Sequence, residues 1–189
     1  DVHVSEGAED AYLVRSLYFD NARYSNFFEK IDGVKKRHKY RIRSYSAVWD
    51  PTTPVFVERK ERNNNRVEKF REQLRAQEFF ALQGEYSWDY FCDGYEDVAQ
   101  QFGIEMLKRS LNPKVVIQYF RTPFVSHHDG QFRVTLDREL VGLASGSLWD
   151  APKRPCRWAS LLPDRTIMEV KFNRRIPAWF HRIIQANSL

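Results

Sequence analysis

Several segments of the sequence alternate charged and apolar residues with a period of two, and this alternation constrains the fold more than any other feature. In one segment Lys39, Arg41 and Arg43 alternate with Tyr40 and Ile42. Because successive side chains of a β-strand point to opposite faces, this spacing places the charges of the segment on one face. The same separation recurs in the segments 55–62, 118–121, 132–137 and 168–172. We therefore predict strands with one charged face, opposed in most of them by a largely apolar one.

The predicted charged face carries ordered basic residues with a few carboxylates among them. The basic residues are Lys39, Arg41, Arg43, Lys60, Arg62, Arg121, Arg133 and Lys171, and the acidic ones are Glu58, Asp137 and Glu169. One interpretation is a sheet with a solvated face and an apolar face on a core. The other is a closed antiparallel barrel with its charged faces inward and helices packed outside. The regular spacing of the cations and the recurring carboxylates favour the barrel.

A barrel lined in this way predicts a polyanionic ligand. Two like charges about 8 Å apart repel by about 2 kcal/mol at an effective dielectric of about 20. Many such pairs would exceed the whole stability of a domain, about 5–15 kcal/mol, so the lumen must hold water and counter-ions. Arginine binds phosphate oxygens through paired hydrogen bonds. Carboxylates supply the hard oxygen ligands of Mg²⁺ and Mn²⁺, so we expect a phosphate chain with a divalent metal.

Local patterns predict an α+β domain with antiparallel strands and without regular βαβ alternation. Branched and aromatic residues predict strands at 14–19, 39–45, 55–62, 66–74, 115–121, 131–140 and 166–172. Apolar spacing and terminal residues predict helices at 23–31, 77–82, 95–111 and 177–186. The length of 189 residues is that of one domain.

Composition excludes several classes of protein. Hydrophobic residues make up 42% of the chain and aromatic residues 15%, which excludes a disordered or low-complexity chain. The 2 cysteines lie far apart, which excludes a disulfide scaffold and a zinc ribbon and favours a reducing compartment. No apolar run reaches the roughly 18 residues of a membrane helix. We expect a cytoplasmic protein whose net charge of +5 permits an anionic partner without requiring one.

The ordered set of charged strands resembles the VTC domain, the polyphosphate polymerase branch of the triphosphate tunnel (CYTH-like) superfamily. The resemblance runs from about residue 14 to 180. No single segment is specific to the family, but the ordered set of segments is. The matching segments are Ser16-Leu17-Tyr18-Phe19-Asp20-Asn21, Lys39-Tyr40-Arg41-Ile42-Arg43-Ser44-Tyr45, Phe56-Val57-Glu58-Arg59-Lys60, Lys69, Tyr119-Phe120-Arg121, Arg133-Val134-Thr135-Leu136-Asp137, Met168-Glu169-Val170-Lys171-Phe172 and Pro177-Ala178-Trp179.

The resemblance implies an eight-stranded antiparallel tunnel that binds tri- and polyphosphate with Mn²⁺ or Mg²⁺. It assigns phosphoryl transfer from ATP to seven basic residues, namely Arg41, Arg43, Lys60, Lys69, Arg121, Arg133 and Lys171. The expected phosphate-binding set adds Lys39, Arg62 and Tyr119. The expected metal ligands are Glu169 and, held more loosely, Glu58 and Asp137. The expected partners are ATP, triphosphate or polyphosphate, without nucleic acid.

The sequence departs from the family pattern at both ends. The family begins with an earlier strand and ends with a Ser-Lys segment, so we expect a single domain over 1–189 that lacks these parts. Polyphosphate synthesis from ATP is the favoured activity, and a triphosphatase would use the same site with water as acceptor. A non-catalytic polyphosphate-binding module would need the basic residues but not Glu169. A nucleic-acid binder could show similar basic residues, but carboxylates on the same face would repel a nucleic-acid backbone.

Overall fold

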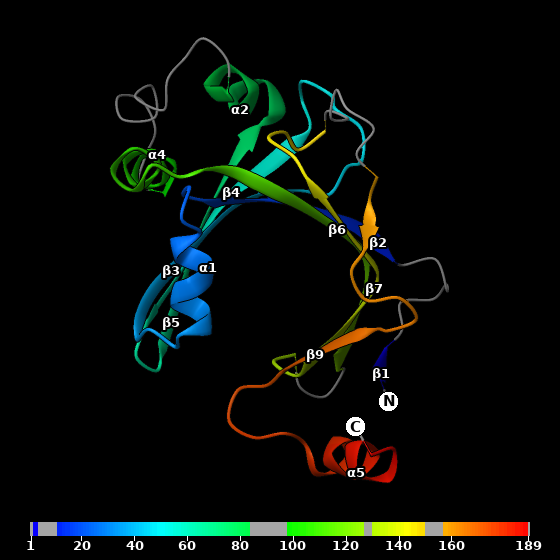
Figure 1. Cartoon of the computed structure of the whole chain (residues 1–189). Coiled ribbons are helices and arrows are strands. Elements are labelled where there is room, and N and C mark those ends of the chain that lie inside the picture. The colour runs from blue at the N-terminus through cyan, green and yellow to red at the C-terminus, as the bar shows by residue number, and fades with distance from the viewer. Residues whose placement is uncertain (1, 4–10, 84–97, 127–129, 150–156, 189) are drawn as a thin grey trace.

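The computed structural model describes residues 2–3, 11–83, 98–126, 130–149 and 157–188, and it confirms the predicted α+β class with an antiparallel sheet. Figure 1 shows one strongly curved sheet, with helices on its convex and on its concave side. The strands are β1 (Val2–His3), β2 (Tyr12–Asp20), β3 (Lys36–Ser44), β4 (Pro54–Asn63), β5 (Arg66–Arg75), β6 (Asn112–Ser126), β7 (Arg133–Ala144), β8 (Ala159–Ser160) and β9 (Ile167–Lys171). The helices are α1 (Ser25–Ile31), α2 (Ala76–Gln83), α4 (Val98–Arg109) and α5 (Ala178–Ala186). The first three residues of the predicted helix 95–111 lie outside the described residues.

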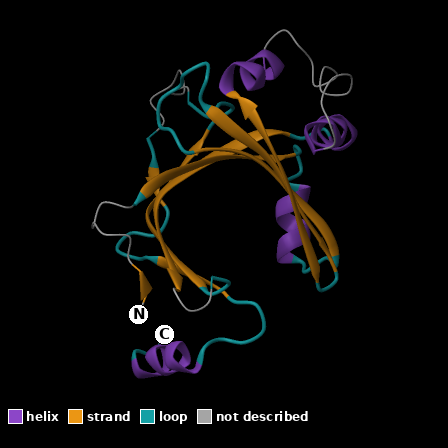
Figure 2. Ribbon diagram, turned by 180° about the vertical axis from the view of Figure 1, so that it is seen from behind, coloured by secondary structure: helices purple, strands orange, loops and turns teal. Residues whose placement is uncertain are grey.

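The predicted closure of the sheet into a barrel is wrong for the described residues. The strand order is β5-β4-β3-β2-β6-β7-β8, with β9 paired to β7 and β1 to β6. In the described part of the chain no ladder joins β5 to β8 or β9, so the sheet forms a deep open trough (Figure 2). Residue alternation specifies which face of a strand is charged. Closure depends instead on strand number and stagger, which alternation does not encode.

The hydrophobic core lies on the convex face of the trough. There Ile42 and Val57 from the sheet are fully buried beneath the helices α2 and α4. Phe102 of α4 meets Phe19 and Tyr40 in edge-to-face contacts, with ring centroids 5.4 and 5.7 Å apart. The predicted apolar faces of β3 and β4 therefore point into this core. Their charged residues must point to the concave face, since the side chains alternate.

A β-bulge in β7 reverses which residues of this strand face the convex side beyond it. Between the pairs Gln118↔Val141 and Phe120↔Arg138 the strand β7 contains one more residue than β6. Glu139 lies in this interval and has a φ of 54°, in the left-handed region that residues with a Cβ rarely adopt. In a regular strand Asp137 and Leu143, which are an even number of residues apart, would point to the same face. The bulge between them places Leu143 on the buried convex side and Asp137 on the concave face.

The short helix α1 is fixed to the concave side of the sheet by the end of β2. The side chain of Asp20 accepts hydrogen bonds from the backbone N–H groups of Asn26 and Phe27, each at 3.0 Å. Asn21 accepts from the N–H of Ser25 at 3.1 Å. These bonds satisfy amides that a helix start leaves without partners. Asp20 and Asn21 thus cap the start of α1 and determine where this helix meets the trough.

Candidate functional site

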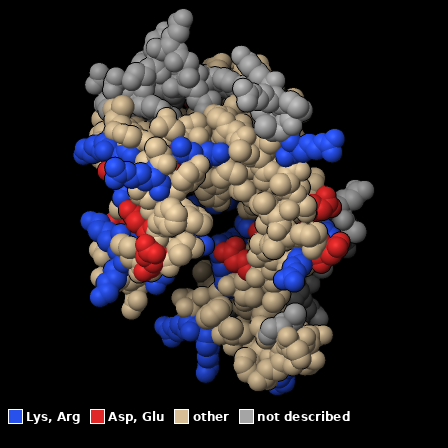
Figure 3. Space-filling view, in the orientation of Figure 1, with Lys and Arg blue, Asp and Glu red and all other residues tan. Residues whose placement is uncertain are grey.

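The concave face encloses a cavity of about 510 Å³, which we call the charged pocket. Figure 3 shows basic and acidic side chains around a central hollow of the molecule. Ten basic side chains and two carboxylates line the charged pocket, together with Tyr18, Val67 and Tyr119. The basic residues are Lys30, Arg37, Lys39, Arg41, Arg43, Lys60, Arg62, Lys69, Arg121 and Lys171, and the carboxylates are Glu58 and Glu169.

The structure brings most of the predicted phosphate-binding residues together. Nine of them line the charged pocket, and they come from β3, β4, β5, β6 and β9. Arg133 is the exception, because it is exposed and does not belong to the lining. It pairs with Lys171 in the β7–β9 ladder, so it extends the charged face beyond the pocket wall.

Glu58 is the centre of one half of the charged pocket. Its side chain is only 2% exposed and lies 2.5 Å from Arg41 and 2.9 Å from Lys69, measured between carboxylate oxygen and nitrogen. Arg71 and Arg43 follow at 3.6 and 3.8 Å. Burial raises the pKa of Glu58, but Arg41 and Arg43 outweigh burial and hold that pKa below its usual value. The carboxylate therefore stays ionised and keeps four cations in place.

A second carboxylate orients Arg121 on the opposite wall. Arg121 donates two hydrogen bonds to Asp137, at 2.6 and 2.7 Å, in a bidentate pair. This pairing raises the pKa of Arg121, and burial lowers it only in part. Arg121 also lies 3.6 Å from Glu169, which in turn is 3.5 Å from Lys171. Asp137 thus holds the guanidinium of Arg121 in one orientation, beside the more exposed Glu169.

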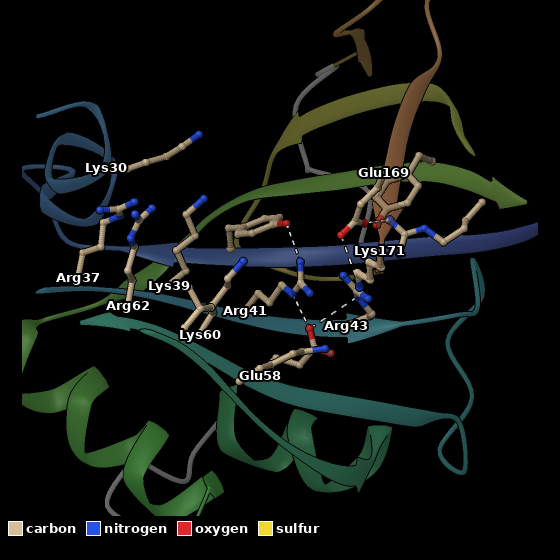
Figure 4. Close-up of a pocket in the computed structure, with 15 residues that line it drawn as sticks. Lys30, Arg37, Lys39, Arg41, Arg43, Glu58, Lys60, Arg62, Glu169 and Lys171 are labelled. Carbon is tan, nitrogen blue, oxygen red and sulfur yellow. Dashed lines mark hydrogen bonds and ion pairs between the residues drawn. The ribbon is translucent and has the colours of Figure 1, made fainter. Parts of the chain in front are cut away.

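The other end of the charged pocket carries cations without a carboxylate partner. Figure 4 shows these side chains, from α1, β3 and β4, on one side of the pocket. No ion pair involves any of them among the described residues; they are Lys30, Arg37, Lys39, Lys60 and Arg62. Burial lowers the pKa of Lys39, and the charges of Lys30, Lys60, Arg41 and Arg37 lower it further. This end therefore has a strongly positive potential that an anion would relieve.

Sequence reasoning missed four residues of the site. Arg37 is two residues from Lys39 on β3, and Arg71 is two residues from Lys69 on β5. Each therefore shares a face of its strand with a predicted residue, and alternation alone could have identified both. Tyr18 pairs with Arg41 in the β2–β3 ladder and accepts a hydrogen bond from its guanidinium at 3.1 Å. Lys30 comes from α1, whose position depends on tertiary contacts, and no local signal indicates its role.

The predicted metal ligands occupy different settings. Among the described residues no three His, Cys, Asp or Glu side chains are grouped as a metal cluster would need. Glu58 and Asp137 lie 2.5 and 2.6 Å from their nearest basic partners, whereas Glu169 lies 3.5 Å from Lys171 and has a side chain that is 45% exposed. Thr135 pairs with Glu169 in the β7–β9 ladder, and its buried hydroxyl has no hydrogen-bond partner. These two residues suit a divalent ion that takes its other ligands from phosphate and water, as Mg²⁺ usually does.

In the part of the chain that the structure describes, no helix is a candidate for spanning a membrane. None of its helices combines the length and the hydropathy that crossing a bilayer requires.

Comparisons with known proteins identify the family and the fold of this chain. No curated protein matches the sequence. A solved structure from Bacillus halodurans, titled as that of a "putative adenylate cyclase", matches with a TM-score of 0.52 and 14% sequence identity. The match covers 97% of this chain and 78% of that one, and at this identity it shows the fold alone. The family model of the VTC domain matches residues 1–189. The chain therefore belongs to the VTC domain family, as the sequence analysis predicts.

Proposed function

We propose that this chain is a metal-dependent phosphoryl transferase that synthesises inorganic polyphosphate from ATP. The observation that carries the proposal is the charged pocket, in which ten basic side chains face one cavity with the exposed carboxylate of Glu169. Such an excess of positive charge matches a phosphate chain, because each phosphate brings negative charge and several hydrogen-bond acceptors.

The two ends of the charged pocket suggest separate tasks. The five cations without carboxylate partners would hold an extended phosphate chain by charge. They are Lys30, Arg37, Lys39, Lys60 and Arg62. Arg41 and Arg121, each oriented by a carboxylate, would bind oxygens of the phosphoryl group in transfer. Phosphoryl transfer depends mainly on such positioning and charge neutralisation.

In the proposed step an oxygen at the end of the acceptor chain forms a bond to the γ-phosphorus of ATP. The bond between that phosphorus and the β–γ bridging oxygen breaks, and ADP leaves with the electron pair. Mn²⁺ or Mg²⁺ held by Glu169 would supply neutralisation of the phosphate oxygens. Lys171, which lies 3.5 Å from Glu169, would add charge at the same place. With water as acceptor, the same arrangement would act as a triphosphatase.

Phosphorus NMR of the protein with ATP and Mn²⁺ over time tests the proposal. Growth of the signal of internal phosphates would support a polymerase, and release of ADP with only free phosphate would replace it by a hydrolase. Binding without turnover would leave a binding module. The Arg41→Ala variant should lose turnover, whereas Arg66→Ala is the matched control. The side chain of Arg66 is 80% exposed and does not line the charged pocket.

A further inference from the structure

A second cavity, of about 960 Å³, lies beside the charged pocket, and its lining is largely apolar. We call it the aromatic pocket. On one side stand Tyr24, Phe27 and Phe28 of α1 and the turn before it. On another stand Val115 and Ile117 of β6 together with Leu161. Pockets of about 300–1,000 Å³ with apolar linings are typical of small-molecule sites.

The aromatic pocket adjoins the charged pocket. Tyr18, Lys30 and Lys39 line both cavities. Figure 4 shows Lys30 reaching from α1 toward the end of the charged pocket where Lys39 lies. A single ligand could therefore place an apolar, flat group in one cavity and a chain of negative charges in the other.

The aromatic side chains of α1 are unusually open to solvent. Tyr24, Phe27 and Phe28 are 50, 54 and 51% exposed. Ring faces in a concave pocket offer a stacking surface for a nucleobase, and such stacking tolerates any base. Lys114 already lies 5.2 Å from the centre of the Tyr24 ring, so the wall also carries a positive charge.

The carboxylate and the side-chain amide of this pocket, Asp20 and Asn26, are occupied by structural tasks. Both carboxylate oxygens of Asp20 accept hydrogen bonds from amides at the start of α1. Asn26 accepts a hydrogen bond from Arg109 at 2.8 Å. Reading the edge of a particular base needs hydrogen-bonding groups that are available to it. The aromatic rings can therefore bind a base by its faces, and neither the carboxylate nor the side-chain amide of the described lining is available to read its edge.

We infer that the aromatic pocket binds the base and ribose of a nucleoside triphosphate whose phosphates lie in the charged pocket. The inference rests on the proposed function, and it adds that the donor is recognised through its nucleoside, with stacking as the main contact. Lys30 and Lys39, at the junction, would contact the phosphates next to the ribose. Tripolyphosphate would occupy only the charged pocket.

Calorimetric titration of ATP and of tripolyphosphate, at one fixed concentration of Mg²⁺, tests the inference. The Phe28→Ala variant should bind ATP about fivefold or more weakly, as expected for loss of a base–aromatic stack, and should bind tripolyphosphate unchanged. Ile31→Ala is the matched control, because Ile31 is on the same helix, is 62% exposed and lines neither pocket. GTP should respond to Phe28→Ala as ATP does.

Each outcome separates the inference from the proposed function. If Phe28→Ala leaves ATP binding unchanged, or weakens ATP and tripolyphosphate equally, the nucleoside does not bind in the aromatic pocket. Binding of both ligands by the wild-type protein would then still support a triphosphate site. If the wild-type protein binds neither, the proposed function fails and this inference falls with it. A thermal unfolding curve for each variant shows whether α1 remains folded.

Discussion

Replacing Glu58 by glutamine tests whether one buried carboxylate holds the charged pocket together. The substitution keeps the shape of the side chain and removes its charge. Four cations would then face one another, with nitrogens that now lie 2.5–3.8 Å from the carboxylate oxygens. Removing one partner of a buried ion pair costs about 3–5 kcal/mol, because the remaining charge loses its compensation. That is a large part of a typical domain stability of about 5–15 kcal/mol.

The assay is urea unfolding at neutral and acidic pH. The pKa of Glu58 is lowered in the folded protein, so the unfolded chain binds its proton more readily. Its stabilisation is therefore complete above the unfolded value, about 4.3, and disappears as the pH falls through the folded value. The wild-type protein and Glu58→Gln should differ by about 3–5 kcal/mol at pH 7. The difference should shrink below a pH of about 4.

The matched control is Glu68→Gln. Glu68 lies 2.6 Å from Arg66, but the two side chains are 40 and 80% exposed. Exposed pairs contribute about 0–1 kcal/mol, so this variant should unfold nearly as the wild-type protein does. Equal effects of the two substitutions, or a Glu58→Gln effect under about 1 kcal/mol, would refute the assignment of Glu58 as the internal counter-ion.

Two further predictions concern other parts of the sheet. Glu169→Gln should abolish metal-dependent turnover in the phosphorus NMR assay while tripolyphosphate still binds without metal, because the substitution removes a ligand charge and no phosphate contact. Turnover at the wild-type rate would remove Glu169 from the site. Glu139→Gly should stabilise the protein by about 1 kcal/mol in urea unfolding, since the left-handed backbone strains a residue with a Cβ. A destabilised Glu139→Gly variant would mean that the side chain contributes more than the strain costs.

Much of the site could be predicted from the sequence, because the facing of side chains on a strand is a local property. The alternation around Arg41 and around Lys60 places charges on one face whatever the sheet does at larger scale. The apolar partners Ile42 and Val57 lie in the core as expected. The VTC family could be identified for the same reason, since its signal is the order of these strands.

Properties that depend on distant parts of the chain could not be predicted. Barrel closure needs two sheet edges to meet, and no single strand contains that information. The position of Lys30 requires α1 to be held over the concave face by Asp20. Arg133 follows the correct parity, yet its strand carries it past the end of the pocket. The odd or even position of a residue in its strand determines which face its side chain points to. It does not determine how far along the trough that side chain lies.

The bulge at Glu139 also limits which changes of length the strand can tolerate. A strand that loses one residue shows its opposite face beyond the deletion. Deleting Glu139 would therefore turn Asp137 toward the convex side, or else turn Leu143 out of it. A point substitution at this position leaves both in place. Among homologous sequences, we expect the spacing between Asp137 and Leu143 to stay constant, with glycine or asparagine frequent at position 139.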